Sequence, residues 1–201
     1  MRTLKEFLEE VNWKEVYIIN YSWKEALFKV KENGFNLRFV KDQTEEICLA
    51  AIKEDYNVLQ YVKDQTDKIC LSTIKIAPLS LHYVRCQTEE ICLEAIKQNS
   101  NALKYVRNQT EAICLAAVKQ DWYALQFAKE QTEAICLAAV KQNGGSLQFV
   151  RYKTETICLA AVKQNIINLQ YVDKSIFKEE IKKYTISELQ EKLWEKFEII
   201  E

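Results

Sequence analysis

The stretch that decides the fold is TEAICLAAVKQ, residues 110–120, which continues into a second apolar segment ending near Ala128. The same pattern recurs along the chain with a period of 22 residues. Self-similarity at such a period is typical of solenoids, in which each unit buries its apolar face against its neighbours. The sequence therefore predicts an array of stacked repeats.

Three residue columns mark the repeat. Units begin at Thr44, Thr66, Thr88, Thr110, Thr132 and Thr154. A cysteine follows four places later, at Cys48, Cys70, Cys92, Cys114, Cys136 and Cys158. A leucine closes each unit, two residues before a Tyr or Phe. A diverged unit precedes these six, because aligning Ser22 with Thr44 places Ala26 at the cysteine position. We therefore predict seven repeats over residues 22–175.

Each unit has the pattern of two short helices. The threonine suits an N-cap, and the acidic residue after it suits the positive end of a helix. In the fifth unit Ile113, Cys114, Ala117 and Val118 share one face by their i, i+3, i+4 spacing, and Leu115 widens the apolar arc. This face is broad enough for a helix sandwiched between neighbouring repeats.

An Asn or Asp, such as Asp121, follows the first helix and either ends it or caps the second. The second helix is expected to place Ala124, Leu125, Phe127 and Ala128 inward. At ~1.5 Å per residue each helix would be only ~12–15 Å long. Helices of this length do not persist alone, so stability must come from stacking.

The composition supports an all-α fold. The 201 residues include 3 Gly and 1 Pro, too few to punctuate a sandwich or barrel. We predict a helical cap over 1–21, an α-solenoid of seven two-helix repeats over 22–175, and a second cap over 176–201. The competing interpretation is a leucine-rich repeat, whose period range includes 22. Its L-x-x-L-x-L signature is absent, so we favour helices.

Charge and cysteine content limit the expected partners and cellular location. There are 28 Lys plus Arg and 29 Asp plus Glu, so the net charge of −1 gives no strong attraction to nucleic acid or anionic membranes. The N-terminus lacks the apolar core of a signal peptide, and no run of about 18 apolar residues could span a bilayer. We therefore expect reduced thiols and a cytoplasmic location.

The unit T-E-x-I-C-L-A-A-V-K-Q-N…L-Q-Y-V is best kept at Thr132–Val150 and Thr110–Ala128. It resembles a helical repeat family of unknown function that occurs in proteins of giant DNA viruses and some bacteria. The resemblance covers about residues 44–172 and weakens across 22–43. It implies a helical repeat protein of viral origin, which would place it in the host cytoplasm, and it carries over no catalytic residues.

The cysteine column invites a metal or redox interpretation, which the spacing disfavours. Packed helices would separate consecutive cysteines by ~8–10 Å, whereas a disulfide needs Cα atoms within ~7 Å and zinc needs ligands within ~2.3 Å. We expect small apolar packing residues instead. Cys86 lies in a polar column and is expected to be the exposed, reactive thiol. His82 also stands in a polar column, and no motif joins it to a nucleophile. We expect no catalytic site, metal or cofactor.

Two basic columns could bind phosphates or an acidic partner. The candidate basic ladder is Lys53, Lys75, Lys97, Lys119, Lys141 and Lys163, with Lys31 in the first unit. The second column is Lys41, Lys63, Arg85, Arg107, Lys129 and Arg151. The alternative is a solvated face whose charges pair with neighbouring Glu and Asp, each pair contributing little. With a net charge near zero we favour that alternative.

The most variable positions lie at the turn between the two helices. Divergent residues on a constant scaffold often form the binding edge. The large residues there are the candidate partner-binding set, Tyr56, Trp122, Tyr123, Ile166 and Ile167. The alternative is partial burial against adjacent turns. We therefore expect a non-enzymatic scaffold that binds another protein, with nucleic-acid binding or end-to-end self-assembly as the other candidates.

Overall fold

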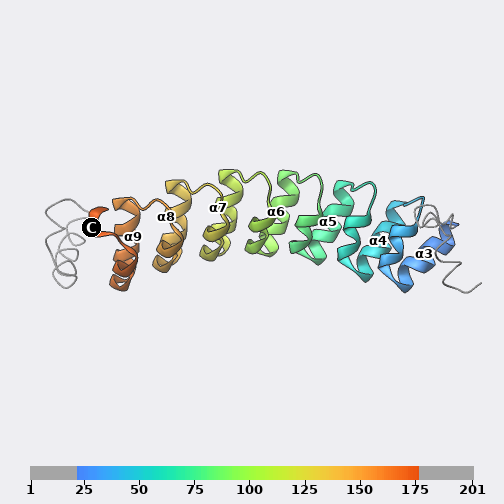
Figure 1. The fold of residues 1–201 in the computed structure, drawn as a ribbon, viewed down its shortest axis with the longest axis horizontal. Helices are drawn as coiled ribbons and strands as arrows, with labels where there is room; N and C mark the ends of the chain where they lie inside the picture. The colour runs from blue at the N-terminus through green and yellow to red at the C-terminus, as the bar shows by residue number, and fades with distance from the viewer. Residues whose placement is uncertain (1–21, 177–201) are drawn as a thin grey trace, which may run out of the picture. The chain divides into compact units, whose positions relative to one another are not determined.

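A computed structural model describes residues 22–176, and within this range the chain is all-helical, without a strand (Figure 1). The two predicted caps, 1–21 and 176–201, lie outside the described residues except for Ile176. Each repeat pairs a ten-residue α-helix with a six-residue 3-10 helix. The α-helices are α3 (Trp23–Glu32), α4 (Glu45–Glu54), α5 (Asp67–Ile76), α6 (Glu89–Gln98), α7 (Glu111–Gln120), α8 (Glu133–Gln142) and α9 (Glu155–Gln164). The 3-10 helices are η1 (Gly34–Phe39), η2 (Tyr56–Tyr61), η3 (Pro78–Tyr83), η4 (Ser100–Tyr105), η5 (Trp122–Phe127), η6 (Gly144–Phe149), η7 (Ile166–Tyr171) and the short η8 (Lys174–Ile176).

The repeat threonines are N-caps, as the sequence predicts. The Thr110 hydroxyl accepts a hydrogen bond from the backbone N–H of Ile113 at 3.3 Å, and the other repeats show the same bond. Ser22 takes this role in the first repeat, where it forms a capping box with Glu25. Each cap satisfies a backbone donor that the helix itself leaves unpaired.

An Asn or Asp joins the two helices in six of the seven repeats. Asp121 ends α7 through its backbone N–H, and its side chain accepts from the N–H of Tyr123 at 2.9 Å to start η5. In the third repeat Ala77 makes no such side-chain bond, and Pro78 occupies the first turn of η3. Proline suits that position because the first N–H of a helix has no partner within it.

The second helix of each repeat is a 3-10 helix, which the sequence did not indicate. At the carboxyl end of this helix the backbone hydrogen bonds run from residue i to residue i−3. In η5, for example, the N–H of Ala128 donates to the carbonyl of Leu125 at 3.1 Å. Six residues are long for a 3-10 helix, so packing rather than propensity holds it. Ala124 and Leu125 are fully buried, whereas Phe127 is only half-buried.

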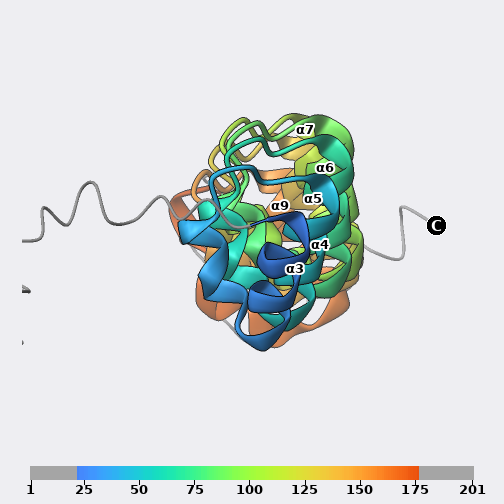
Figure 2. The same cartoon turned by 90° about the vertical axis from the view of Figure 1, so that its right-hand side faces the viewer.

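The chain divides into two compact units, Met1–Ala95 and Ile96–Glu201, and the division falls within α6. In the first unit α3, α4 and α5 follow one behind another (Figure 2), each in contact with the next. In the second unit α7, α8 and α9 lie side by side in that order (Figure 1). Each unit is thus a stretch of α-solenoid. None of the helices between residues 22 and 176 has the length and apolar character needed to span a lipid bilayer.

The core repeats with the sequence. In α7 the residues Ile113, Cys114, Ala117 and Val118 are at most 2% exposed, and Leu125 of η5 is completely buried. The residues equivalent to these four of α7 are buried in α4, α5, α6, α8 and α9 as well, whereas in the diverged first repeat only Ala26 and Val30 of α3 are buried. Burial of this apolar set provides the main stabilisation, because each Å² of apolar surface that is removed from water stabilises the folded state by roughly 25 cal/mol.

A glutamine at the end of each repeat joins it to the next one. The Nε2 group of Gln131 donates to the carbonyl of Leu125 at 3.2 Å and to the carbonyl of Phe149 at 3.0 Å. Its Oε1 accepts from the backbone N–H of Arg151 at 2.9 Å. We call this three-bond arrangement the glutamine clamp. Gln43, Gln65 and Gln109 make the same three bonds at their own junctions.

The last junction lacks the clamp. Lys153 occupies the glutamine position before α9 and has no side-chain oxygen to accept a hydrogen bond. In the repeat that follows, Leu169 is half-buried, whereas the equivalent Leu125 and Leu147 are fully buried. The seventh repeat is therefore held less tightly than those before it.

We predict that Gln131→Ala lowers the free energy of unfolding by about 1 kcal/mol, because it removes two part-buried hydrogen bonds and one exposed hydrogen bond to the backbone. The measurement is urea denaturation followed by circular dichroism. Gln148→Ala is the matched control, since the exposed Gln148 donates only to the carbonyl of Gly145 within its own helix, at 3.1 Å.

In the same experiment Lys153→Gln should stabilise the protein by about 1 kcal/mol by restoring a clamp. Equal effects of Gln131→Ala and Gln148→Ala would contradict the structural role of the clamp.

Candidate interaction surfaces

The lysine ladder is exposed along its whole length. It comprises Lys53, Lys75, Lys97, Lys119, Lys141 and Lys163, with Lys31 ahead of them, each in the last turn of its α-helix. A lysine here is favourable because the carboxyl end of a helix carries partial negative charge. The ammonium groups of Lys53, Lys75 and Lys119 make no hydrogen bond or ion pair within residues 22–176. These groups can therefore meet a ligand without first breaking a bond.

In the second unit a glutamine supports the backbone of the ladder. The side chain of Gln142 donates to the carbonyl of Lys119 at 3.0 Å and accepts from the N–H of Trp122 at 2.5 Å. Gln120 donates in the same way to the carbonyl of Lys97 at 2.9 Å. In the compact unit of residues 1–95, Glu54 and Ile76 occupy the position of Gln120 and Gln142. Neither side chain can donate such a bond.

In the second basic column, four side chains bond to the backbone, a kind of partner that the sequence did not indicate: Lys63, Arg85, Lys129 and Arg151. These side chains donate to backbone carbonyls of the preceding repeat. Lys63 reaches the carbonyl of Lys41 at 2.7 Å, and Arg151 reaches those of Ala128 and Lys129 at 2.7 and 2.6 Å. These long side chains bridge loops that carry unpaired carbonyl groups, and this gives the column a structural role.

The candidate edge between the helices is partly exposed. Tyr56, Tyr123 and Ile167 are 41%, 44% and 64% exposed. Trp122 and Ile166 are half-buried, so the alternative of burial against adjacent turns applies to these two. Ile76 was missed by sequence reasoning although it is 54% exposed. The signal was present, because other repeats have Glu or Gln at its position.

Trp122 is held in an aromatic cluster of the second unit. Its ring stacks on that of Phe149 in the next repeat, with centroids 6.1 Å apart and planes 28° apart. The Tyr123 ring meets the edge of Phe149 at 5.3 Å. Tyr123 is therefore a ring fixed by its neighbours yet open to solvent, which reduces the entropy lost when a partner binds.

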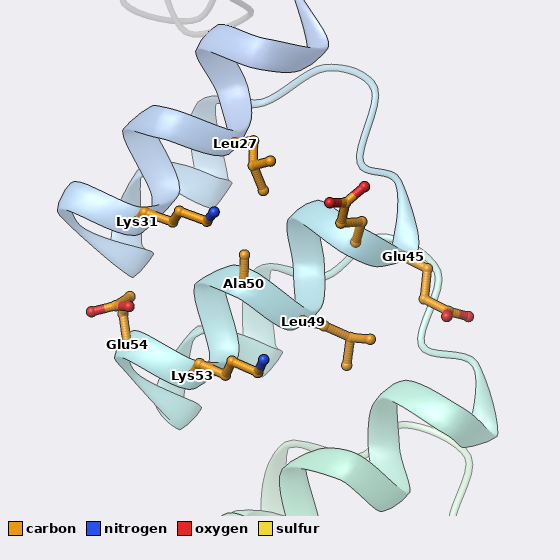
Figure 3. A pocket seen from close by; sticks show the side chains of 8 residues that line it. Leu27, Lys31, Glu45, Leu49, Ala50, Lys53 and Glu54 are labelled. Atoms are coloured by element: carbon orange, nitrogen blue, oxygen red, sulfur yellow. The ribbon is translucent and has the colours of Figure 1, made fainter.

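A groove of about 470 Å³ lies between α3 and α4 (Figure 3). Its lining is Leu27, Lys31, Glu45, Glu46, Leu49, Ala50, Lys53 and Glu54. In Figure 3 Leu27 and Ala50 point into the space between the two helices, and Lys31 and Lys53 extend in the same direction from consecutive helices. An apolar floor with charges of both signs at its rim suits an amphipathic segment better than a uniformly charged ligand.

All seven cysteines are free, and Cys86 is the exposed one, as predicted. Burial raises the pKa of the Cys48, Cys70 and Cys158 thiols to about 11, with nearby carboxylates adding to the effect at Cys48. Burial likewise raises the pKa of Cys114 and Cys136. The column therefore consists of protonated packing residues at neutral pH. No group of three His, Cys, Asp or Glu side chains in the described range is placed to hold a metal ion.

The fold and its surfaces define a helical repeat protein. A family model described as "Domain of unknown function (DUF4116)" matches residues 132–177, the sixth and seventh repeats. This part of the chain is similar to a family whose function is not established. No curated protein and no solved structure matches the chain.

We predict that a thiol reagent such as Ellman's reagent modifies one cysteine of the native protein quickly and the other six only on unfolding. The thiolate is the reacting form, and a thiol with a pKa of about 11 is almost fully protonated at pH 8. Cys86→Ser should abolish the fast phase. Two or more fast-reacting thiols in the wild-type protein would contradict the buried column.

Proposed function

We propose that this protein is a non-enzymatic repeat scaffold that binds another protein along the edge formed by the turns between its helices. The observation that carries the proposal is the exposure of large apolar side chains at positions that differ between repeats. Tyr56, Leu79, Tyr123 and Ile167 are 40–64% exposed there. The buried set of α4 to α9, by contrast, keeps Ile, Cys, Ala or Thr, and Ile or Val at its four positions.

Two physical features support this edge. Aromatic side chains bind with little loss of rotamer entropy and are enriched among the residues that dominate interface energies. The cluster of Trp122, Tyr123 and Phe149 is fixed before any partner arrives. A scaffold with constant packing and variable turns can change its partner without changing its fold.

The resemblance to repeat proteins of giant DNA viruses supports a viral origin within this proposal. The partner would then be a protein met in the cytoplasm of the host. The proposal takes no cofactor, and the partner is defined only by the apolar, aromatic surface that it must cover.

The test is affinity purification of the tagged protein from its native cellular setting, with and without nuclease, read by mass spectrometry. Tyr123→Ala and Ile167→Ala together should reduce recovery of a nuclease-resistant partner at least tenfold, as expected for residues central to an interface. Tyr152→Ala is the control, because Tyr152 is 83% exposed but lies in the loop between two repeats and not in a turn between the two helices of one repeat. Equal loss with both sets of changes, or no loss with either, would contradict binding at the edge.

Nucleic-acid binding along the lysine ladder is the second candidate. It is favoured by the exposure of these lysines and by the absence of any bond from Lys53, Lys75 or Lys119 within residues 22–176. Neutralising several phosphates would release counterions, so affinity should fall steeply with salt.

For this candidate we predict that replacing Lys53, Lys75, Lys119 and Lys141 with Gln weakens binding to single-stranded RNA and flattens the slope of log K against log salt. The measurement is fluorescence anisotropy at several salt concentrations. Replacing Lys41, Lys63, Lys129 and Arg151 of the second column with Gln removes the same number of charges and is the control, with circular dichroism to check the fold because these side chains also bridge loops. Salt-independent or undetectable RNA binding by the wild-type protein would remove this candidate.

A further inference from the structure

In the second unit the α-helices expose an apolar stripe opposite to the side that packs in the core. The stripe is Ala112, Leu115 and Ala116 in α7, and Ala134, Leu137 and Ala138 in α8. The first alanine of each helix is exposed and the other two residues are half-buried. Their i, i+3, i+4 spacing places them on one face, which α9 continues with Thr156 at the first position. We call this surface, across α7, α8 and α9, the outer face.

At the first of these three positions α4, α5 and α6 carry charges, whereas at the third position the first unit has Phe28, Ala50, Ser72 and Glu94. Glu46, Lys68 and Glu90 occupy the positions of Ala112 and Ala134, and Glu94 occupies the position of Ala116 and Ala138. The fold therefore accepts charged residues at these positions, so packing alone does not require alanine there. Leucine occupies the second position in both units, so the outer face of the second unit differs by its uncharged first position, which leaves the whole stripe without charge, as expected of a surface that something covers.

Two rows of opposite charge border the outer face. Glu111, Glu133 and Glu155 lie at the first residue of the three helices, and Lys119, Lys141 and Lys163 lie eight residues later. Eight residues correspond to ~12 Å along a helix. These are all the charged residues of the three helices, so the face carries no net charge. The Glu111 and Glu133 carboxylates accept hydrogen bonds from the hydroxyls of Thr132 and Thr154, which leaves their charges in place.

We propose that the outer face binds a second copy of this chain, with each helix antiparallel to its counterpart. A two-fold axis that runs across the helices, parallel to the rows, brings the glutamate row of one protomer onto the lysine row of its partner. An axis along the helices would instead place glutamates against glutamates. Self-complementarity of this kind is what a two-fold interface requires.

The charge pattern selects this occupant over others. A strongly acidic partner, such as nucleic acid, would be attracted by the lysine row but repelled by the glutamate row. A second copy satisfies both rows at once and covers the Leu and Ala residues between them. Alanines at the contact let two helices approach to the short end of the usual ~8–10 Å range.

The test is the mass of the full-length protein by size-exclusion chromatography with light scattering. The wild type is expected at twice the chain mass of 23.6 kDa at concentrations of tens of micromolar. One variant carries Lys119→Glu, Lys141→Glu and Lys163→Glu, and a second carries Glu111→Lys, Glu133→Lys and Glu155→Lys. Each variant alone should be monomeric, because like charges then oppose each other. An equimolar mixture should form heterodimers, since complementarity is restored between the two.

Charge reversal also opposes the helix dipole, so a second pair of changes keeps the test independent of folding. Ala116→Glu with Ala138→Glu copies the natural Glu94 of α6 and should yield a folded monomer by circular dichroism. Ser72→Glu, at the same position in α5, is the control and should remain dimeric. A monomeric wild type, a mixture that stays monomeric, or a dimer that survives both alanine changes would overturn the proposal.

Discussion

The glutamine clamp is the interaction on which the rest of the structure depends. Each repeat consists of two helices too short to persist alone, connected by a loop whose backbone groups need partners. One glutamine side chain supplies a donor to two carbonyls and an acceptor to one N–H, and these belong to two successive repeats. Because the clamp bonds only to backbone groups, its hydrogen bonds do not depend on which side chains the neighbouring repeat carries. The variable turn residues can therefore change while the junction stays the same.

The two basic columns carry the same charge but differ in their bonding to the rest of the structure. Lys63 and Arg151 lie across the inter-repeat loops and bond to carbonyls, and their charge serves the fold. Lys53 and Lys119 stand at helix ends without such bonds in the described part of the chain. What separates the columns is position, because one follows the loop and the other ends the α-helix. Composition alone treats them alike.

Much of this architecture could be predicted from the repeat. The period, the threonine caps, the linking Asn or Asp and the buried Ile-Cys-Ala-Val face all follow from local rules, and the structure confirms them. The 3-10 character of the second helix could not be predicted, since six residues are too few to distinguish a period of 3.0 from 3.6. The clamp was also missed. A glutamine in a polar loop gives no sign that its partners lie up to 20 residues ahead.

The candidate surfaces were predictable in part for the same reason. Exposure at Tyr123 and Cys86 follows from their columns, whereas the half-burial of Trp122 depends on Phe149 in the next repeat. Gly144 is a further example of such dependence. A Cβ there would lie 2.2 Å from the side-chain Nδ2 of Asn168. This Nδ2 group donates a hydrogen bond to the carbonyl of Ala161 at 2.8 Å. Such pairs are set by three-dimensional packing, which one sequence does not reveal.

Because of Lys153, the sixth and seventh repeats are joined by fewer hydrogen bonds than the earlier repeats of the second unit. Where the junctions at Gln109 and Gln131 each add three hydrogen bonds, the junction at Lys153 adds none of this kind. In a solenoid each repeat is stabilised only by its neighbours, so opening begins where the coupling between neighbours is weakest. We therefore expect the seventh repeat to exchange its amide protons with solvent sooner than the fifth and sixth repeats, which the clamps at Gln109 and Gln131 join to their neighbours.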